Sequence, residues 1–297
     1  MQWLQAMFQS KPQHKYAINS KMLGDENLIA WSNLGYWDAK TTSYPHACRR
    51  LASRLADAVH LTSNDRVLDL GCGQGASLQL WNEQYHVRHI EAVELQAHCV
   101  SLIQHNLDFI HRIQCTSFFN LNVRNFEFKF DVILCIDAAY HYNLNSFLNS
   151  VSNILNSQGR LGFHSLSLTE KFDALSAVQK LKYQALLKCA DVCLSDLNTA
   201  QQIEQLLWQH GYDEIQIEQL TEPVLSGFSH YIQKQQQATP KKSPVELTLN
   251  KHMDRFKIEM TAKLCQKLYT EGLIDYVQIT AKKRDENHRT PETTKPH

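Results

Sequence analysis

The chain lacks net charge and long apolar runs. Its 30 Lys and Arg residues balance 30 Asp and Glu residues, so no overall field draws it to nucleic acid or to an acidic membrane surface. No apolar stretch approaches the roughly 20 residues that span a bilayer. The N-terminus, MQWLQAMFQS, shows no apolar core followed by a small-residue cleavage site, which argues against a signal peptide. We therefore predict no membrane span and no nucleic-acid partner.

The chain also lacks the cysteine spacing of a zinc site. Its 8 cysteines are scattered, and no CxxC pair occurs. Cys189 and Cys193 stand four residues apart on an expected helix, but no matching His or Cys pair accompanies them, so core packing is the preferred interpretation. The sequence predicts free thiols, no metal site and a cytoplasmic location, where thiols stay reduced.

Short apolar runs alternate with helical stretches in the middle of the chain. This alternation is typical of βαβ units and a parallel sheet. Helices are expected at residues 76–84, 96–109 and 144–155, the last closed by a turn at 156–159. The expected strands are residues 66–70, 90–95, 113–118, 131–137, 160–165, 214–220 and 276–282.

The spacing of these elements divides the chain into a main domain and its additions. Two segments between strands are far longer than ordinary connections, which favours functional insertions such as a lid. The expected parts are an N-terminal helical segment and flap at 1–60, a main domain at 61–283 with helical insertions at 166–212 and 221–275, and a disordered tail at 284–297.

The strongest local signal is VLDLGCGQG at residues 67–75, where a strand leads into a glycine-rich turn and then a helix. Glycines allow positive φ and a close approach of a ligand to the backbone, and the amides that open the helix favour an anionic group. Glu94 follows at the end of the next strand, where a carboxylate can accept both hydrogen bonds of a ribose diol. The pattern predicts a nucleoside ligand.

A nicotinamide-dependent oxidoreductase is one alternative, because the spacing of Gly71, Gly73 and Ala76 also fits a dinucleotide site. Asp69 argues against it, since a carboxylate two residues before the first glycine would repel a pyrophosphate but could accept from an ammonium group. The polar and aromatic residues 137–141, which close the fourth strand, argue in the same direction.

Four segments together resemble the class I S-adenosylmethionine (SAM) methyltransferases: VLDLGCGQG, VEL at Glu94, FDVILCIDAAYH and SQGRLGF. The resemblance covers residues 30–165 and is closest to the branch that acts on small molecules such as quinones, tocopherols, sterols and antibiotic sugars. It implies a Rossmann-like α/β fold, SAM as cofactor and a small-molecule acceptor as partner. With the two late strands, we predict a seven-stranded sheet of order 3-2-1-4-5-7-6 whose last strand is antiparallel.

The resemblance also implies site residues. The glycines would wrap the methionine part of SAM, with Asp69 near its amino group, Glu94 on the ribose and Leu95 against adenine. Many relatives carry an Asp-Ala pair after the third strand, but here the residues read SFFN, which leaves Ser117 as the candidate adenine contact. The implied cofactor-binding residues are Tyr36, Trp37, Asp69, Gly71, Cys72, Gly73, Gly75, Glu94, Leu95, Ser117, Asp137 and Ala138.

Two histidines are candidate catalytic bases. His141 follows the fourth strand and His164 ends the fifth, so both are expected at the carboxyl edge of the sheet, where ligands bind. The resemblance to sugar O-methyltransferases of the rebeccamycin type implies catalytic groups at about these two places. Tyr36 or Trp37, in the aromatic run NLGYW, is expected to face the sulfonium by cation–π attraction.

The predicted function is transfer of a methyl group from SAM to an oxygen, nitrogen or carbon of a small molecule. The transfer would be in line, with a histidine as the candidate base. Besides the oxidoreductase, a SAM-binding protein without turnover stays an alternative. Methylation of nucleic-acid bases has little support, because no Asn/Asp-Pro-Pro-Tyr motif follows the fourth strand.

Overall fold

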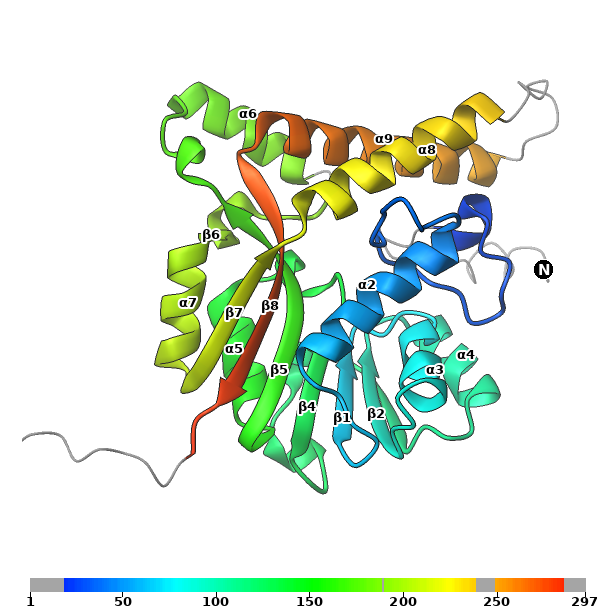
Figure 1. The fold of residues 1–297 in the computed structure, drawn as a ribbon, viewed down its shortest axis with the longest axis vertical. Coiled ribbons are helices and arrows are strands. Elements are labelled where there is room, and N and C mark those ends of the chain that lie inside the picture. Colours follow the sequence, from blue (N-terminus) through cyan, green and yellow to red (C-terminus); the bar gives the residue numbers. More distant parts are fainter. Residues whose placement is uncertain (1–18, 189, 239–248, 286–297) are drawn as a thin grey trace, which may run out of the picture.

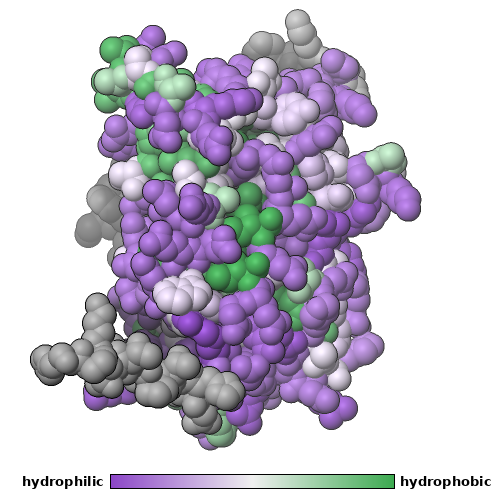
Figure 2. All heavy atoms as spheres, turned by 60° about the vertical axis from the view of Figure 1, so that its left-hand side comes forward, coloured by the Kyte–Doolittle hydropathy of each residue, from purple (hydrophilic) through white to green (hydrophobic). Residues whose placement is uncertain are grey.

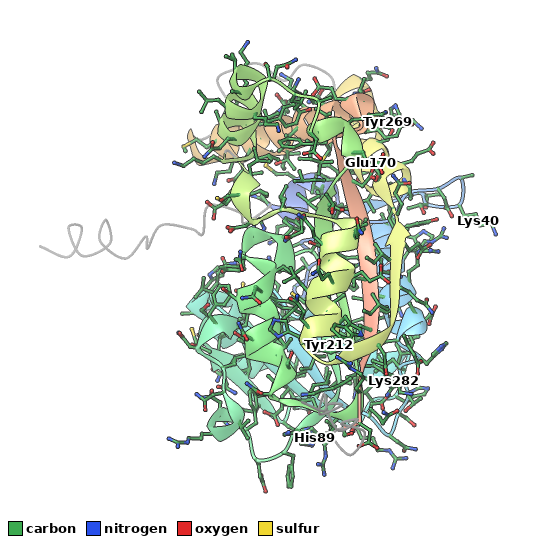
Figure 3. The ribbon with its side chains drawn as sticks, turned by 90° about the vertical axis from the view of Figure 1, so that its left-hand side faces the viewer. Lys40, His89, Glu170, Tyr212, Tyr269 and Lys282 are labelled. Carbon is green, nitrogen blue, oxygen red and sulfur yellow. The ribbon has the colours of Figure 1, made fainter. Side chains whose placement is uncertain are left out.

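A single twisted sheet with helices on both faces forms the body of the protein, and a layer of helices lies over one end of it (Figure 1). This computed structural model describes residues 19–188, 190–238 and 249–285. Figure 3 shows the same arrangement from the side: His89, which opens a central strand, lies at the end of the sheet opposite the helical layer, near which Glu170 and Tyr269 lie.

The sheet has the predicted strand order. Its strands are β1 (Arg66–Leu70), β2 (His89–Glu94), β3 (Arg112–Cys115), β4 (Phe130–Cys135), β5 (Leu155–Leu168), β6 (Asn198–Thr199), β7 (Tyr212–Gln219) and β8 (Ile274–Lys283). The order is β3-β2-β1-β4-β5-β8-β7, and β8 is antiparallel to both of its neighbours. Numbered by the seven predicted strands this is 3-2-1-4-5-7-6, so the predicted order and the antiparallel last strand are confirmed. The sheet also holds an eighth strand that was not predicted, the short β6, which pairs with the end of β5.

The helices account for most of the remaining chain. The α-helices are α2 (Tyr44–Ala58), α3 (Ala76–Glu83), α4 (Ala97–Asn106), α5 (Leu144–Ser152), α6 (Ala177–Lys188), α7 (Ala200–Gln209), α8 (Gly227–Ala238) and α9 (Leu249–Glu271). Short 3-10 turns include η2 (Phe118–Asn120) and η4 (Ala139–His141), and the π-helical turn η7 (Glu222–Ser226) leads into α8. None of the described helices is both long and apolar enough to cross a membrane.

The two faces of the sheet bury different helices. Along β4, Val132 and Leu134 pack with residues of α2, α3 and α4, whereas Ile133 and Cys135 pack with residues of α5 and α7. Successive side chains of a strand point to opposite faces, so a strand covered on both faces is apolar throughout, as VILC is here.

We call the helical layer formed by α6, α8 and α9 the cap. Its side chains share one apolar cluster with the start of β8, including Leu187, Phe228, Cys265 and Tyr276. Because β8 is antiparallel to β5, its first residue, Ile274, pairs with the end of β5. The helix α9, which comes immediately before β8, therefore lies over the carboxyl edge of the parallel strands.

The start of β5 differs from the prediction. Residues 156–159 were expected as a turn after a helix over 144–155, but the helix ends at Ser152 and these residues belong to an irregular part of β5. Leu155 pairs with Phe130 and Arg160 pairs with Val132, so four residues bulge out opposite Asp131. The Asp131 carboxylate anchors the bulge by accepting from Asn156 Nδ2 at 2.7 Å.

The expected insertion over residues 166–212 contains two different structures. Its first residues complete β5, and α6 belongs to the cap, but α7 packs its buried Ile203 and Leu207 into the main core beside α5. The insertion at 221–275 holds η7, α8 and α9. Residues 239–248 of this insertion lie outside the described residues, as do residues 286–297 of the expected tail.

The contact between α2 and β5 yields a stability prediction. A Cβ atom on Gly162 would lie 2.7 Å from Val59 Cγ1 and 3.1 Å from Leu55 Cδ1. We expect Gly162→Ala to lower the free energy of unfolding by about 1–3 kcal/mol through overpacking, as measured by urea denaturation. Ser165→Ala on the same strand, which adds no atoms, is the control. Equal stability of the Gly162 variant and the wild type would contradict this close packing.

Candidate active site

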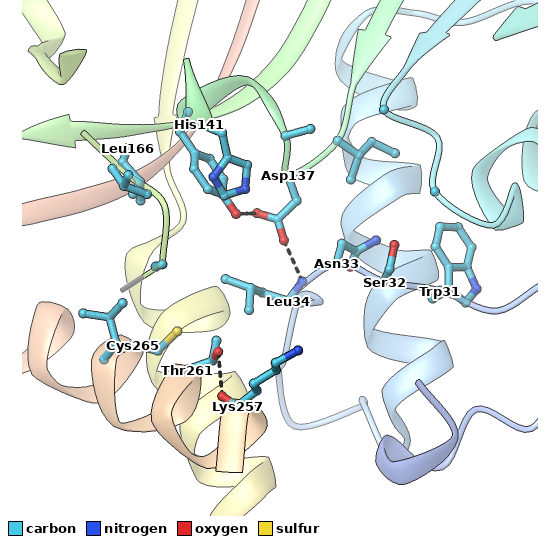
Figure 4. Close-up of a pocket in the computed structure, with 18 of the residues that line it drawn as sticks. Trp31, Ser32, Asn33, Leu34, Asp137, His141, Leu166, Lys257, Thr261 and Cys265 are labelled. Atoms are coloured by element: carbon cyan, nitrogen blue, oxygen red, sulfur yellow. Dashed lines mark hydrogen bonds between the residues drawn. The ribbon is translucent and has the colours of Figure 1, made fainter. Parts of the chain in front are cut away.

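A cavity of about 670 Å³ lies between the carboxyl edge of the sheet and the cap. The structure brings ten of the fourteen predicted site residues to its wall, and Figure 4 shows part of that wall. These ten residues are Asp69, Gly71, Cys72, Gly73, Glu94, Leu95, Ser117, Asp137, Ala138 and His141. The other four, Tyr36, Trp37, Gly75 and His164, lie elsewhere.

The glycine turn after β1 forms one end of the cavity. Gly71 and Gly73 both have positive φ, 72° and 56°. A Cβ atom on Gly73 would lie 2.8 Å from Ser32 Oγ, and one on Gly71 would lie 3.0 Å from Ala138 Cβ. Only glycine accommodates both the conformation and the crowding, so the turn leaves its backbone open toward the cavity.

Glu94 is held in place at the end of β2. One carboxylate oxygen accepts from the Gly73 amide at 2.9 Å and the other from the Gln96 amide at 2.8 Å. The side chain is 5% exposed and lines the cavity. These bonds orient the carboxylate, whose remaining lone pairs can still accept from a ligand. Leu95 follows it and presents an apolar side chain that is 46% exposed.

Asp69 is a buried acid beneath the glycine turn. Its carboxylate is 1% exposed and accepts from Trp81 Nε1 at 2.8 Å. Burial raises its pKa to about 6, while the bonds from Ser77 and Trp81 oppose that rise and the nearby Glu94 adds to it. A buried acid of this kind favours a cationic ligand group, which would supply the missing counter-charge.

Asp137 follows β4 with a positive φ of 55°, which is uncommon outside glycine but tolerated by Asp. One oxygen accepts from the Leu34 amide at 2.8 Å (Figure 4). The other accepts from the phenols of Tyr140, at 2.7 Å, and Tyr276, at 3.0 Å. Burial raises the pKa of Asp137, and the three donors oppose that rise. The N-terminal segment, η4 and β8 thus meet on one carboxylate.

Of the two predicted catalytic histidines, only His141 lines the cavity. Its Nδ1 lies 3.3 Å from the carbonyl oxygen of Asp191. A carbonyl can only accept, so this contact assigns the proton to Nδ1 and makes Nε2 the basic nitrogen of the neutral ring.

His164 is fully buried and lies away from the cavity, which corrects the expectation that both histidines reach it. It sits on β5 opposite Gln278, with its ring 5.5 Å from that of Tyr276. Burial lowers its pKa to about 3, so it is neutral at physiological pH and a poor base. Its position on a strand covered on both faces explains the difference.

The aromatic run expected over the ligand faces elsewhere. Tyr36 packs under the guanidinium of Arg54, 4.6 Å from its ring centroid. Trp37 stacks on Tyr231 of α8, with ring centroids 4.3 Å apart, and its Nε1 donates to the Leu34 carbonyl at 2.8 Å. The two side chains therefore fix the N-terminal segment to α2 and α8, and they do not line the cavity.

Gly75 also has a packing role. Its φ is 96°, and a Cβ atom there would lie 2.8 Å from Ile103 Cγ1 of α4. It caps the start of α3 and lets α3 and α4 approach each other. Its place in the sequence motif does not bring it to the cavity wall.

Many residues of the cavity wall were not predicted from the sequence. The N-terminal segment contributes the residues just before the aromatic pair, from Trp31 to Leu34. The cap contributes Leu187 and Val192 near α6 and one face of α9, from Asp254 to Leu268. The sequence predicted that the second insertion is helical, but it did not show which helix face would meet the site.

A match to a known protein family shows to which family this chain belongs. A family profile described as a methyltransferase domain matches residues 41–217, which is more than half of the chain. The chain belongs to the methyltransferase-domain family.

Several proteins are similar to this methyltransferase-family chain. The erythromycin 3''-O-methyltransferase of Saccharopolyspora erythraea is 28% identical over 116 residues, 38% of either protein, so the match spans well under two thirds of that relative. The cyclopropane synthase MmaA2 of Mycobacterium tuberculosis has a TM-score of 0.69 at 17% identity, with 91% of this chain and 96% of that one covered. The geranyl diphosphate C-methyltransferase of Streptomyces coelicolor has a TM-score of 0.62 at 15% identity, with 89% and 96% covered.

The two structural likenesses show the fold, which agrees with the Rossmann-like α/β fold predicted. Among the residues that the structure describes, no group of three or more His, Cys, Asp or Glu side chains could hold a metal ion.

The buried Asp69 yields a pH prediction. Its folded-state pKa of about 6 lies above the ordinary value of 3.8, so the folded protein binds its proton more tightly than the unfolded chain. Stability from this group is present below about pH 4 and is lost as the pH rises from about 4 through about 6. Relative to Asp69→Asn, the wild type should lose about 2–3 kcal/mol of unfolding free energy across that window, measured by urea denaturation at several pH values. A constant difference between the two proteins would contradict the raised pKa.

Proposed function

We propose that this protein is a SAM-dependent methyltransferase that acts on a small-molecule acceptor bound under the cap. One observation carries the proposal: a single cavity joins the glycine turn and Glu94, at one end, to an apolar wall of α6 and α9 at the other. Such a space can hold a nucleoside cofactor and a second molecule beside it.

The residues present fit SAM. The open backbone at Gly71 and Gly73 leaves room for the methionine part, and the buried carboxylate of Asp69 lies where it can meet an ammonium group. Glu94, already oriented by two amides, would accept from the ribose hydroxyls, and the exposed Leu95 would pack on the adenine. Ser117 stays the candidate adenine contact. When bound, SAM would supply a methyl group activated on a sulfonium.

The related proteins support this assignment. The geranyl diphosphate C-methyltransferase structure contains S-adenosyl-L-homocysteine, and the erythromycin relative is named as an O-methyltransferase. Family membership and the buried Asp69 both favour methyl transfer over a nicotinamide-dependent reaction. The predicted cytoplasmic location stays a prediction.

This chain's part in the reaction is to align the acceptor, exclude water and receive a proton where the acceptor loses one. The cap and the segment from Trp31 to Leu34 would exclude water. His141 is the candidate base, through Nε2, because it is the histidine on the cavity wall. His164 is no longer a candidate.

Calorimetric titration of the full chain with SAM, S-adenosylhomocysteine and NADH tests the cofactor assignment. We expect saturable binding of the first two and none of NADH. Incubation with methyl-labelled SAM and a pool of small metabolites then tests turnover. Binding without any labelled product would instead favour a SAM-binding protein that lacks turnover, and binding of NADH alone would overturn the proposal.

Loss of the Glu94 carboxylate should weaken SAM binding. We expect Glu94→Ala to reduce affinity by about 1–3 kcal/mol, because ribose hydroxyls would lose a charged acceptor. Calorimetry on the folded variant measures this effect. Glu91→Gln, on the same strand but outside the cavity wall, is the matched control. If both variants bind SAM like the wild type, Glu94 has no place in the site.

Replacement of His141 separates catalysis from cofactor binding. His141→Ala should lower kcat by about 10²–10⁴-fold if the acceptor must lose a proton, while SAM affinity stays unchanged. Single-turnover transfer from labelled SAM to an acceptor found in the metabolite screen measures the rate. Unaltered kcat would show that this side chain is not the base.

A further inference from the structure

The cap wall of the cavity carries a lysine that forms no ion pair within the described residues. Lys257 of α9 is half-buried and lines the cavity. Figure 4 shows its side chain extending from α9 toward Leu34, with its ammonium end between the cap and the N-terminal segment. Within the ranges that the structure describes, no ion pair or side-chain hydrogen bond of Lys257 occurs.

None of the acids around the cavity forms an ion pair with Lys257 within the described part of the chain. Asp69, Glu94 and Asp137 accept the hydrogen bonds described above. Asp254, one turn before Lys257, accepts from Asn19 Nδ2 at 2.8 Å. Two ion pairs occur within the described part of α9, and neither includes Lys257: Arg255 pairs with Glu259, and Lys267 pairs with Glu271. A ligand anion can therefore supply the ion-pair partner that Lys257 lacks among the described residues.

Besides Lys257, four polar residues of α9 line the cavity, and the rest of the cap wall is apolar; the four are Asp254, Thr261, Lys263 and Lys267. Leu187, Val192, Ile258 and Leu268 line the cavity and are buried. Phe256 also lines it, yet is 64% exposed, which marks an apolar rim toward solvent. Figure 2 shows hydrophobic side chains at the cap end and in the middle of an otherwise largely hydrophilic face. The apolar side chains of the cap that line the cavity fit an apolar ligand body better than a sugar or another polar one.

We propose that the acceptor is an amphiphilic anion: its apolar body packs between α6 and α9, and its anionic group is held by Lys257. The proposal rests on the proposed function, because it assigns this part of the cavity to the acceptor and the glycine turn to the cofactor. The methionine carboxylate of SAM is the other anion that could reach an ammonium group in this cavity. The experiment therefore measures cofactor and acceptor affinities separately.

Two fluorescent probes of nearly equal shape test the proposal. One is 1-anilinonaphthalene-8-sulfonate, and the other is N-phenyl-1-naphthylamine, which lacks the sulfonate. Each is titrated into the full chain saturated with S-adenosylhomocysteine. We expect the wild type to bind the sulfonate about tenfold or more tightly than the neutral probe, which is the gain from a charge-assisted contact in a partly buried site.

Variants then locate the effect. Lys257→Gln should weaken the sulfonate probe by about ten- to a hundredfold, with the neutral probe and S-adenosylhomocysteine unchanged. Lys234→Gln, an exposed α8 residue outside the cavity wall, removes the same charge and should change neither probe. Thr261→Trp, one turn after Lys257 on the cavity wall, should block both probes.

Several outcomes would overturn the proposal. These are equal affinity of the two probes for the wild type, equal weakening of both in Lys257→Gln, or undiminished binding in Thr261→Trp, which would place the probes outside the cavity. Weaker binding of S-adenosylhomocysteine in Lys257→Gln would assign this lysine to the cofactor carboxylate instead. If the wild type fails to bind S-adenosylhomocysteine at all, the proposed function itself fails, so the two failures are distinguishable.

Discussion

The hydrogen bonds to the Asp137 carboxylate hold the site together. A carboxylate enclosed in this way is costly unless donors surround it, and the donors come from distant parts of the chain. The Leu34 amide is 103 residues away in the sequence and the Tyr276 phenol is 139 residues away. Because the donors belong to the N-terminal segment, η4 and β8, their hydrogen bonds to Asp137 hold these three segments in position around the cavity. His141 ends η4, so its place on the wall depends on the same carboxylate.

The antiparallel direction of β8 has a similar effect on the cap. A parallel last strand would begin at the far edge of the sheet and take its preceding helix there. Because β8 begins beside the end of β5, α9 lies over the cavity and presents Ile258, Lys257 and Leu268 to it. The strand that completes the sheet thereby also places the wall opposite the glycine turn, and the cavity lies between the two.

The successes of the sequence analysis lie where neighbouring residues decide the structure. Alternating apolar runs predicted seven strands, and the glycine spacing predicted a turn with positive φ at Gly71 and Gly73. The predicted places of Trp37 and His164 were wrong because each side chain is chemically suited to two different surroundings. Trp37 is equally suited to a ligand or to Tyr231, and packing against α8 decided for the latter. His164 ends a predicted strand, but β5 continues to Leu168 and buries it.

The sequence alone specifies the parallel core, the glycine turn and the acid at the end of β2, because each depends on local periodicity, backbone freedom or short spacing. It also determined membership of the methyltransferase-domain family, whose motifs are local too. Tertiary packing sets which histidine faces the cavity, which residues of the N-terminal segment line it, and that Lys257 lines it without an ion-pair partner among the described residues. These features depend on how segments more than a hundred residues apart pack together, and no local pattern encodes that contact.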